Sequence, residues 1–128
     1  MDKESWLKIT SFHRKKCEKI LEVSKEIRYA GVFNEYGHTI AGKIRPGMKP
    51  IFSPNAVREE FFNIASSMKL REKSSKILGE LDYILINHKK IRVLLFYKNK
   101  ITYYITIGSK IESTTLFINK IKKIITEI

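Results

Sequence analysis

Three β-type segments follow one another in the second half of the chain, and the links between them are only three residues long. A parallel connection needs a crossover of about a dozen residues, so these segments are expected to form antiparallel hairpins. In the middle segment, apolar residues occupy both alternating sets of positions, which makes both faces of that strand apolar. Such a strand belongs in a sheet that is covered on both sides. The segments are residues 81–87, 91–97 and 101–107, and the links are residues 88–90 and 98–100.

Helices are expected to supply that cover. Apolar residues recur at helical spacing near residues 5–27, between Ser53 and Gly79, and near residues 113–128. The middle helix has the clearest local signals, because Ser53 is a favourable N-cap and Pro54 suits a first helical turn. Gly79 is expected to end it.

A further hairpin is expected between the first two helices, with strands at residues 28–33 and 38–44 around a turn at residues 34–37. The predicted element order is then α-β-β-α-β-β-β-α. Runs of strands without βαβ alternation predict an α+β fold, here a five-stranded antiparallel sheet with helices on both faces. A chain of 128 residues is expected to form one domain, residues 1–128.

The charge of the chain is strongly positive, with 25 basic and 13 acidic residues and a net charge of +12. Such an excess favours an anionic partner. The bias is toward Lys, with nineteen Lys against six Arg, whereas phosphate-binding surfaces favour the Arg fork. An AT-rich genome would also produce this bias, and solvated charge also keeps a domain soluble. If the first and last helices lie side by side, they form a basic face of Arg14, Lys15, Lys19, Lys120, Lys122 and Lys123.

Signatures of catalysis are missing from the sequence. It contains no P-loop, no dinucleotide fingerprint and no zinc-protease motif. His13 and Cys17 stand four residues apart on a helix, but two ligands are too few for a structural zinc site, and both fit the apolar stripe of the first helix. We therefore predict no enzymatic activity, no cofactor and no metal. Tyr103 and Tyr104 are expected in the core rather than as a base-stacking platform.

The surroundings of the chain are also constrained by composition. A single cysteine excludes a disulfide within the chain. No run of eighteen apolar residues is present, so no membrane span is expected. The polar first five residues do not fit a signal peptide, and we expect a cytoplasmic protein.

The element order, the element lengths and the Pro/Gly loop at residues 45–50 resemble the roadblock family, which is related to dynein light chain roadblock and to prokaryotic regulators of small GTPases. Residues 27–37 (IRYAGVFNEYG) and 40–42 (IAG) are also similar to small uncharacterised proteins of ammonia-oxidising archaea. The resemblance implies first and last helices on one face of the sheet and the middle helix on the other. It further implies dimers in which two middle helices and two sheet edges meet. Longin, profilin and sensor folds share a similar element order, and the basic first helix departs from the roadblock pattern.

The middle helix is apolar over a wide arc, so part of it is expected to meet a partner. Phe62 and Met68 are the candidate interface residues of this helix, and Ile51 and Phe52 in the preceding loop are expected to join them. The preferred interpretation is a homodimeric roadblock-like scaffold or regulator that binds another protein, with a small GTPase as one candidate partner. The alternative is a protein that binds nucleic acid or an anionic surface through the basic face. A small-ligand sensor would need a pocket between helix and sheet, which sequence does not reveal.

Overall fold

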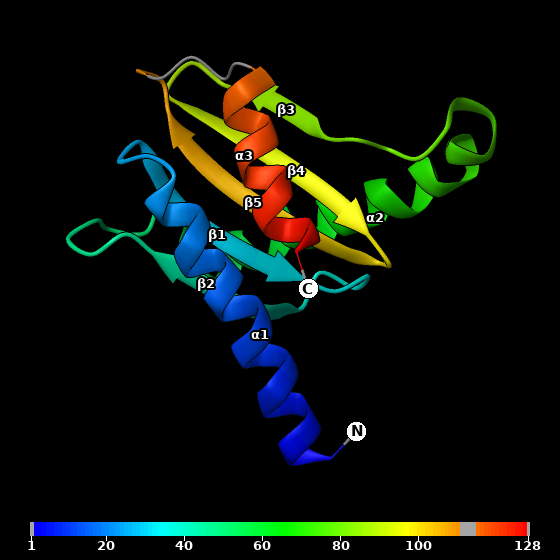
Figure 1. Ribbon diagram of the computed structural model, residues 1–128, viewed down its shortest axis with the longest axis horizontal. Coiled ribbons are helices and arrows are strands. Elements are labelled where there is room, and N and C mark those ends of the chain that lie inside the picture. The colour runs from blue at the N-terminus through cyan, green and yellow to red at the C-terminus, as the bar shows by residue number, and fades with distance from the viewer. Residues whose placement is uncertain (1, 111–114, 128) are drawn as a thin grey trace.

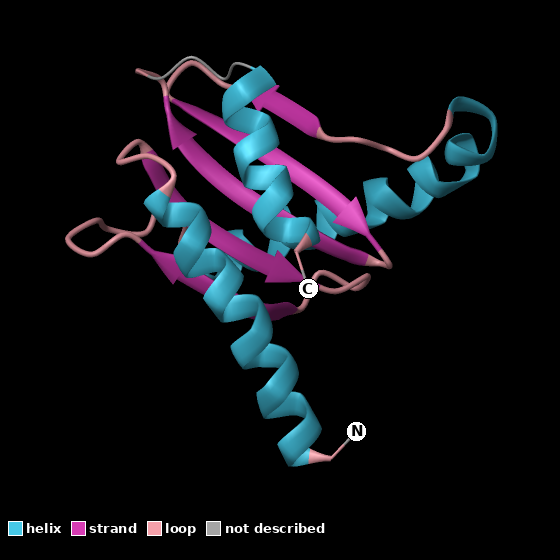
Figure 2. Cartoon of the chain, viewed as in Figure 1, coloured by secondary structure: helices cyan, strands magenta, loops and turns pink. Residues whose placement is uncertain are grey.

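A computed structural model describes residues 2–110 and 115–127 of the chain (Figure 1). The predicted order α-β-β-α-β-β-β-α is confirmed (Figure 2). No helix in the described part of the chain is long and apolar enough to cross a membrane. The elements are α1 (Lys3–Glu22), β1 (Ile27–Phe33), β2 (Thr39–Ile44), α2 (Pro54–Leu78), β3 (Ile84–Asn87), β4 (Ile91–Lys98), β5 (Ile101–Gly108) and α3 (Thr115–Thr126).

The sheet has the strand order β2-β1-β5-β4-β3, and every neighbouring pair is antiparallel. β5 lies at the centre, hydrogen-bonded to β1 on one side and β4 on the other. Helices α1 and α3 cover one face, and α2 crosses behind the opposite face (Figure 1). This three-layer arrangement is the one that the roadblock resemblance implies.

Each face of the sheet has its own hydrophobic core because strand side chains alternate. Adjacent residues of β5 show the division: Tyr103 lies in the core under α1 and α3, and Tyr104 lies in the core under α2. Phe33 stacks on Phe61 in the α2 core, with 4.5 Å between their ring centroids. Both tyrosines are buried, as predicted.

Helix α1 ends at Glu22, earlier than the predicted boundary near residue 27. The guanidinium of Arg45 explains the difference, because it donates hydrogen bonds of 2.5–2.8 Å to carbonyl oxygens at the end of α1 and the start of β1. Carbonyls that a longer helix would use internally are satisfied from outside, so the chain is free to turn into the sheet. The three acceptors are the carbonyls of Leu21, Ser24 and Ile27.

The remaining boundaries follow local signals closely. Asp2 caps α1 by accepting a 2.8 Å hydrogen bond from the Ser5 amide. Ser53 caps α2, and Gly79 ends it with φ of 93°, both as predicted. β3 begins at Ile84 rather than at residue 81. The expected start of the last helix, near residue 113, lies outside the described residues.

Candidate protein interface

The outer side of α2 carries an apolar stripe that the sheet does not cover. Phe62 is 60% exposed, and Leu70 and Ile77 are more exposed still. At roughly 100° per residue these three side chains fall within an arc of about 80° on the helix. The buried residues Phe61 and Met68 point to the other side, toward the sheet. α2 therefore buries one apolar side against its own sheet and exposes three further apolar side chains on the outer side, in an arc that they share with Ser66 and Lys73.

The length of α2 adds to this exposure. The helix has 25 residues, and its C-terminal part extends past the tips of the strands before the chain returns to β3 (Figure 1). Ile77 and Leu78 lie in this overhanging part and are largely exposed. An exposed apolar patch of this kind is typical of a protein-interaction surface.

The predicted interface residues separate into two groups. Phe62 lies on the outer face of α2, and Ile51 is about half exposed in the loop before the helix. Phe52 is partly buried against the α2 core. The prediction for Met68 is wrong: its side chain is 1% exposed, because it occupies the same helical stripe as Phe61 and fills the core under α2.

Tyr36 is a neighbour of this surface that sequence reasoning missed. It lies in the β1–β2 turn, where the Asn34 carboxamide oxygen accepts hydrogen bonds from the amides of Tyr36 and His38. The Lys69 ammonium of α2 lies 4.6 Å from the Tyr36 ring centroid, in a cation–π contact. The turn packs so closely on α2 that a Cβ placed on Gly37 would lie 2.7 Å from the Phe62 amide nitrogen. The tip of the hairpin therefore extends the outer surface of α2.

The sheet also has an open edge at β3. Among the described strands this four-residue strand pairs with β4 alone, so its outer edge has no strand partner in that part of the chain. An unpaired strand edge is a template for a strand from another chain. Tyr83, immediately before β3, is exposed beside this edge.

The residues of the predicted basic face come from two helices that lie on the same side of the sheet (Figure 1). The Lys16 ammonium joins these helices by donating a 2.5 Å hydrogen bond to the Ile125 carbonyl near the end of α3. Lys122 is half-buried and forms an ion pair with Asp82, which reduces its contribution. The other five residues are exposed: Arg14, Lys15, Lys19, Lys120 and Lys123.

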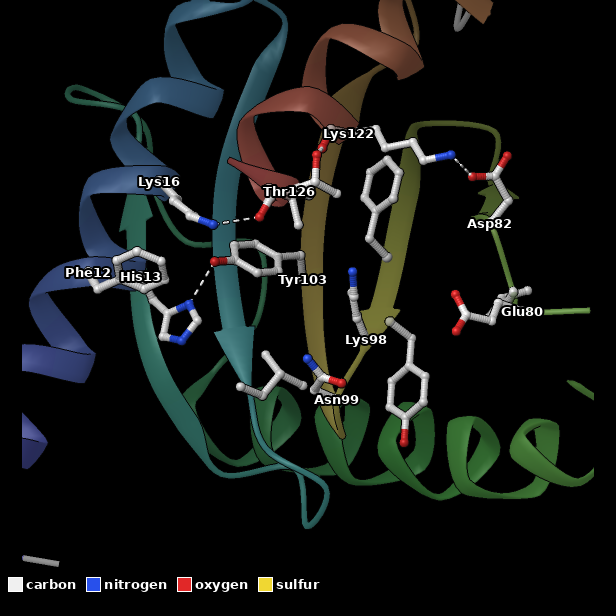
Figure 3. Close-up of a pocket in the computed structure, with 15 residues that line it drawn as sticks. Phe12, His13, Lys16, Glu80, Asp82, Lys98, Asn99, Tyr103, Lys122 and Thr126 are labelled. Carbon is white, nitrogen blue, oxygen red and sulfur yellow. Dashed lines mark hydrogen bonds and ion pairs between the residues drawn. The ribbon is translucent and has the colours of Figure 1, made fainter. Parts of the chain in front are cut away.

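A pocket of about 450 Å³ opens beside these helices, at the ends of β4 and β5 (Figure 3). Inside it, His13 Nδ1 lies 2.6 Å from the Tyr103 hydroxyl oxygen. Burial, with a smaller effect from Lys16, lowers the pKa of His13. Lys98 and Lys122 line the same pocket, and Figure 3 shows Lys122 directed at Asp82.

The chemistry available near this pocket is limited by burial. Burial raises the pKa of the Cys17 thiol to about 12, so the reactive thiolate is scarce near neutral pH. Burial also raises the pKa of Tyr103 above its usual value. His13 and Cys17 both lie in the core, as predicted. Among the described residues, no group of three or more His, Cys, Asp or Glu side chains is placed to hold a metal ion.

In the described part of the chain, three helices lie on the two faces of a five-stranded antiparallel sheet, and comparison with solved structures shows that this arrangement is a roadblock-like fold. The chain is similar to the gliding protein MglB of Thermus thermophilus, with a TM-score of 0.69, 12% identity, and coverage of 89% of this chain and 85% of that one. It is similar to Myxococcus xanthus MglB, with a TM-score of 0.68, 12% identity, and coverage of 98% and 90%.

A Roadblock/LC7 domain from Streptomyces avermitilis is also similar, with a TM-score of 0.66, 5% identity, and coverage of 88% and 90%. No protein-family model matches the chain, and no curated protein matches it by sequence. At these identities the shared property is the fold.

Proposed function

We propose that residues 1–128 form a homodimeric roadblock-like regulatory or scaffold module that binds another protein. The observation that carries this proposal is the apolar stripe on the outer side of α2, defined by Phe62, Leu70 and Ile77. These side chains face away from the sheet, and burying them against a second copy of α2 would remove their apolar surface from water. The open edge of β3 offers a second point of contact.

The comparisons support an assembly of this kind. One similar structure, with 15% identity and a TM-score of 0.66, is described as MglB with a tetrameric arrangement. A two-fold pairing through one helix and one strand edge is self-complementary, as a closed dimer requires. The roadblock resemblance makes a small GTPase the first candidate for the bound protein.

Sedimentation velocity at tens of micromolar tests the dimer. The chain should sediment as a dimer, and Phe62→Asp should sediment as a monomer, because the substitution places a carboxylate in the apolar stripe. Leu116→Asp is the matched control, since Leu116 is similarly exposed on α3, on the other face of the sheet. A monomeric wild-type chain, or a dimer that survives Phe62→Asp, would contradict the proposal.

The basic face supports a second candidate function, which is binding to nucleic acid or another anionic surface. The supporting observation is that α1 and α3 bring Arg14, Lys15, Lys19, Lys120 and Lys123 to one side of the molecule. Lysine-rich surfaces bind phosphates through a salt-dependent, sequence-independent attraction.

A salt titration of binding to duplex DNA tests this second candidate. If the basic face binds, log affinity should fall with log salt at a slope of about −0.9 for each phosphate contacted. Replacing Lys15, Lys19 and Lys120 by Glu should abolish binding. The same three changes at Lys43, Lys89 and Lys90, which are exposed on β2 and in the β3–β4 turn, alter the net charge equally and lie outside both the basic face and α2, so they should preserve most of the affinity. Absence of binding at low salt would remove this candidate.

A further inference from the structure

A second pocket lies on the α2 side of the sheet and differs in character from the first. Its volume is about 390 Å³, and it is lined by β1, β2, β5, the start of α2 and the loop that leads into that helix. Its walls are mainly apolar and include Ile44, Met48, Phe52 and Phe61. The size and apolar lining are those of a small-molecule site.

A β-bulge directs the side chain of a charged residue toward this pocket. The pairing of β1 with β5 shifts register between Ile27 and Tyr29, which leaves Arg28 as the extra residue. Ile27 packs in the core under α1 and α3, and Tyr29 packs against the core under α2. Arg28 and Tyr29 are consecutive, yet both line the pocket on the α2 side. A regular strand would have placed them on opposite faces, whereas a bulge re-aims one of them.

Two polar atoms in the pocket wall are buried without a hydrogen-bond partner. They are the Arg28 Nε and the Thr106 Oγ1, and Thr106 is only 3% exposed. Among the described residues, none donates to, accepts from or forms an ion pair with Arg28 or Thr106 through their side chains. Buried polar groups are nearly always satisfied, and leaving one without a partner costs about 1–3 kcal/mol.

The two atoms lie at the same end of the pocket. Thr106 of β5 is the register partner of Tyr29, the residue next to Arg28. A guanidinium and a hydroxyl therefore lie on neighbouring strands of the pocket wall, and most of the remaining lining is apolar. A ligand that satisfies both parts has an acceptor at one end and an apolar body.

Tyr29 shapes the floor of the pocket. Its ring lies over Gly31 and Gly42, which are register partners on β1 and β2. A Cβ built on either glycine would collide with the Tyr29 hydroxyl oxygen. The paired glycines thus leave room for the ring between sheet and pocket. Burial raises the pKa of Tyr29 to about 12, so its hydroxyl remains neutral beside the pocket.

We propose that this pocket binds a small monocarboxylate with an apolar body, such as a medium-chain or aromatic acid, with its carboxylate at Arg28 and Thr106. The Arg fork binds a carboxylate bidentately, and Arg28 supplies that fork. Lys49, exposed in the loop before α2, also lines the pocket and adds to its attraction for an anion. The Thr106 hydroxyl donates a further hydrogen bond to the carboxylate. The ligand's apolar body contacts Phe52, Phe61 and Met48.

Calorimetric titration with octanoate, below its critical micelle concentration, tests the site. Octanoate should bind saturably at one site per chain, and 1-octanol, which lacks the charge, should bind at least tenfold more weakly. Arg28→Gln should weaken octanoate binding about tenfold or more and leave octanol binding unchanged. Arg58→Gln is the matched control, because Arg58 is exposed on α2 and does not line the pocket.

Thr106→Val separates binding from folding. The substitution keeps the shape of the side chain and removes a buried hydroxyl that has no partner, so the ligand-free variant should melt at the same temperature or higher. Its affinity for octanoate should still fall. On the wild-type chain, octanoate should shift the amide NMR signals of Thr106 and Gly42.

Several outcomes would overturn the proposal. Equal affinity for octanoate and octanol would show no anion selectivity, and unsaturable binding would show only partition into apolar surface. Binding unchanged in Arg28→Gln would place the ligand elsewhere. This test is independent of the test for the dimer, because Phe62 does not line the pocket. Octanoate binding should persist in monomeric Phe62→Asp, and its loss there would show that one chain does not complete the site.

Discussion

Phe61 and Phe62 are neighbours in sequence with the same side chain and opposite surroundings. Phe61 is 2% exposed and stacks on Phe33, whereas Phe62 is 60% exposed on the outer face of α2. Truncating each to alanine separates the contribution of the α2 core from that of the proposed dimer. The change in side chain, and therefore in intrinsic helix propensity, is the same at both positions, so only the surroundings differ.

The expected magnitudes differ widely. Phe61→Ala removes a ring that packs between Phe33 and Tyr104, with centroid distances of 4.5 and 5.0 Å. Such truncations in a core cost about 3–5 kcal/mol. Phe62→Ala removes a ring with little protein around it, and surface changes of this kind stay within about 0.5 kcal/mol in a monomer. If Phe61→Ala does not fold, Phe61→Leu should lose about 2 kcal/mol, at roughly 0.8 kcal/mol for each buried carbon removed.

Urea unfolding followed by circular dichroism, at two protein concentrations, gives both quantities. A dimer makes the apparent free energy of unfolding rise with protein concentration. Phe61→Ala should lower that free energy at both concentrations. Phe62→Ala should leave it unchanged in dilute solution and remove the increase seen in concentrated solution.

Two results would refute this reasoning. If Phe62→Ala cost as much as Phe61→Ala in dilute solution, the two side chains would not lie on opposite faces of α2. If Phe61→Ala cost less than about 1 kcal/mol, the core under α2 would not be packed as described. The ratio of the two costs therefore tests the orientation of the helix independently of the dimer.

Three further outcomes are expected. In thermal unfolding, Gly37→Ala should destabilise the chain by about 1–3 kcal/mol, because the φ of Gly37 is 82° and a Cβ there would meet the backbone of α2. Gly47→Ala is the matched control: the φ of Gly47 is 85°, but the space around it is open, so the loss of stability should be smaller. Burial lowers the pKa of His13 from 6.5, so the unfolded state binds its proton more readily, and stability should be full above about pH 6.5 and fall below it. The fall should be smaller in His13→Asn when unfolding free energies at pH 7 and pH 5 are compared. Arg45→Lys should lower the free energy of unfolding in urea by about 2–3 kcal/mol, because an ammonium cannot reproduce the three hydrogen bonds of the guanidinium to carbonyl oxygens. A decrease below about 0.5 kcal/mol would show that those hydrogen bonds do not determine where α1 ends.

Sequence patterns predicted the features that local chemistry determines. The ends of α2 follow from Ser53, Pro54 and Gly79, whose capping roles depend on their own side chains and backbone. The antiparallel order of β3, β4 and β5 follows from two short links. The sheet is covered on both faces because β4 is apolar on both faces.

Features that depend on distant residues were not visible in the sequence. The end of α1 is determined by Arg45, which is 24 residues from the Leu21 carbonyl that it binds. Lys122 contributes less to the basic face because it forms an ion pair with Asp82, which is 40 residues away in the chain. Met68 was assigned to an interface because helical spacing gives the width of an apolar arc but not which part of it meets the sheet. The orientation of Arg28 depends on the register between β1 and β5, which no local pattern contains.

The arrangement of layers allows the two candidate surfaces to act together. The apolar stripe of α2 and the basic face of α1 and α3 lie on opposite sides of the sheet (Figure 1). A dimer formed through α2 would therefore leave both basic faces uncovered and directed away from the junction. When one basic face of such a dimer has bound an anionic partner, the other basic face is held close to that partner at a high effective concentration, provided that the partner is long enough to reach both faces. Dimerisation through α2 and binding of an anionic partner are thus compatible, and the dimer would strengthen that binding without adding a new contact.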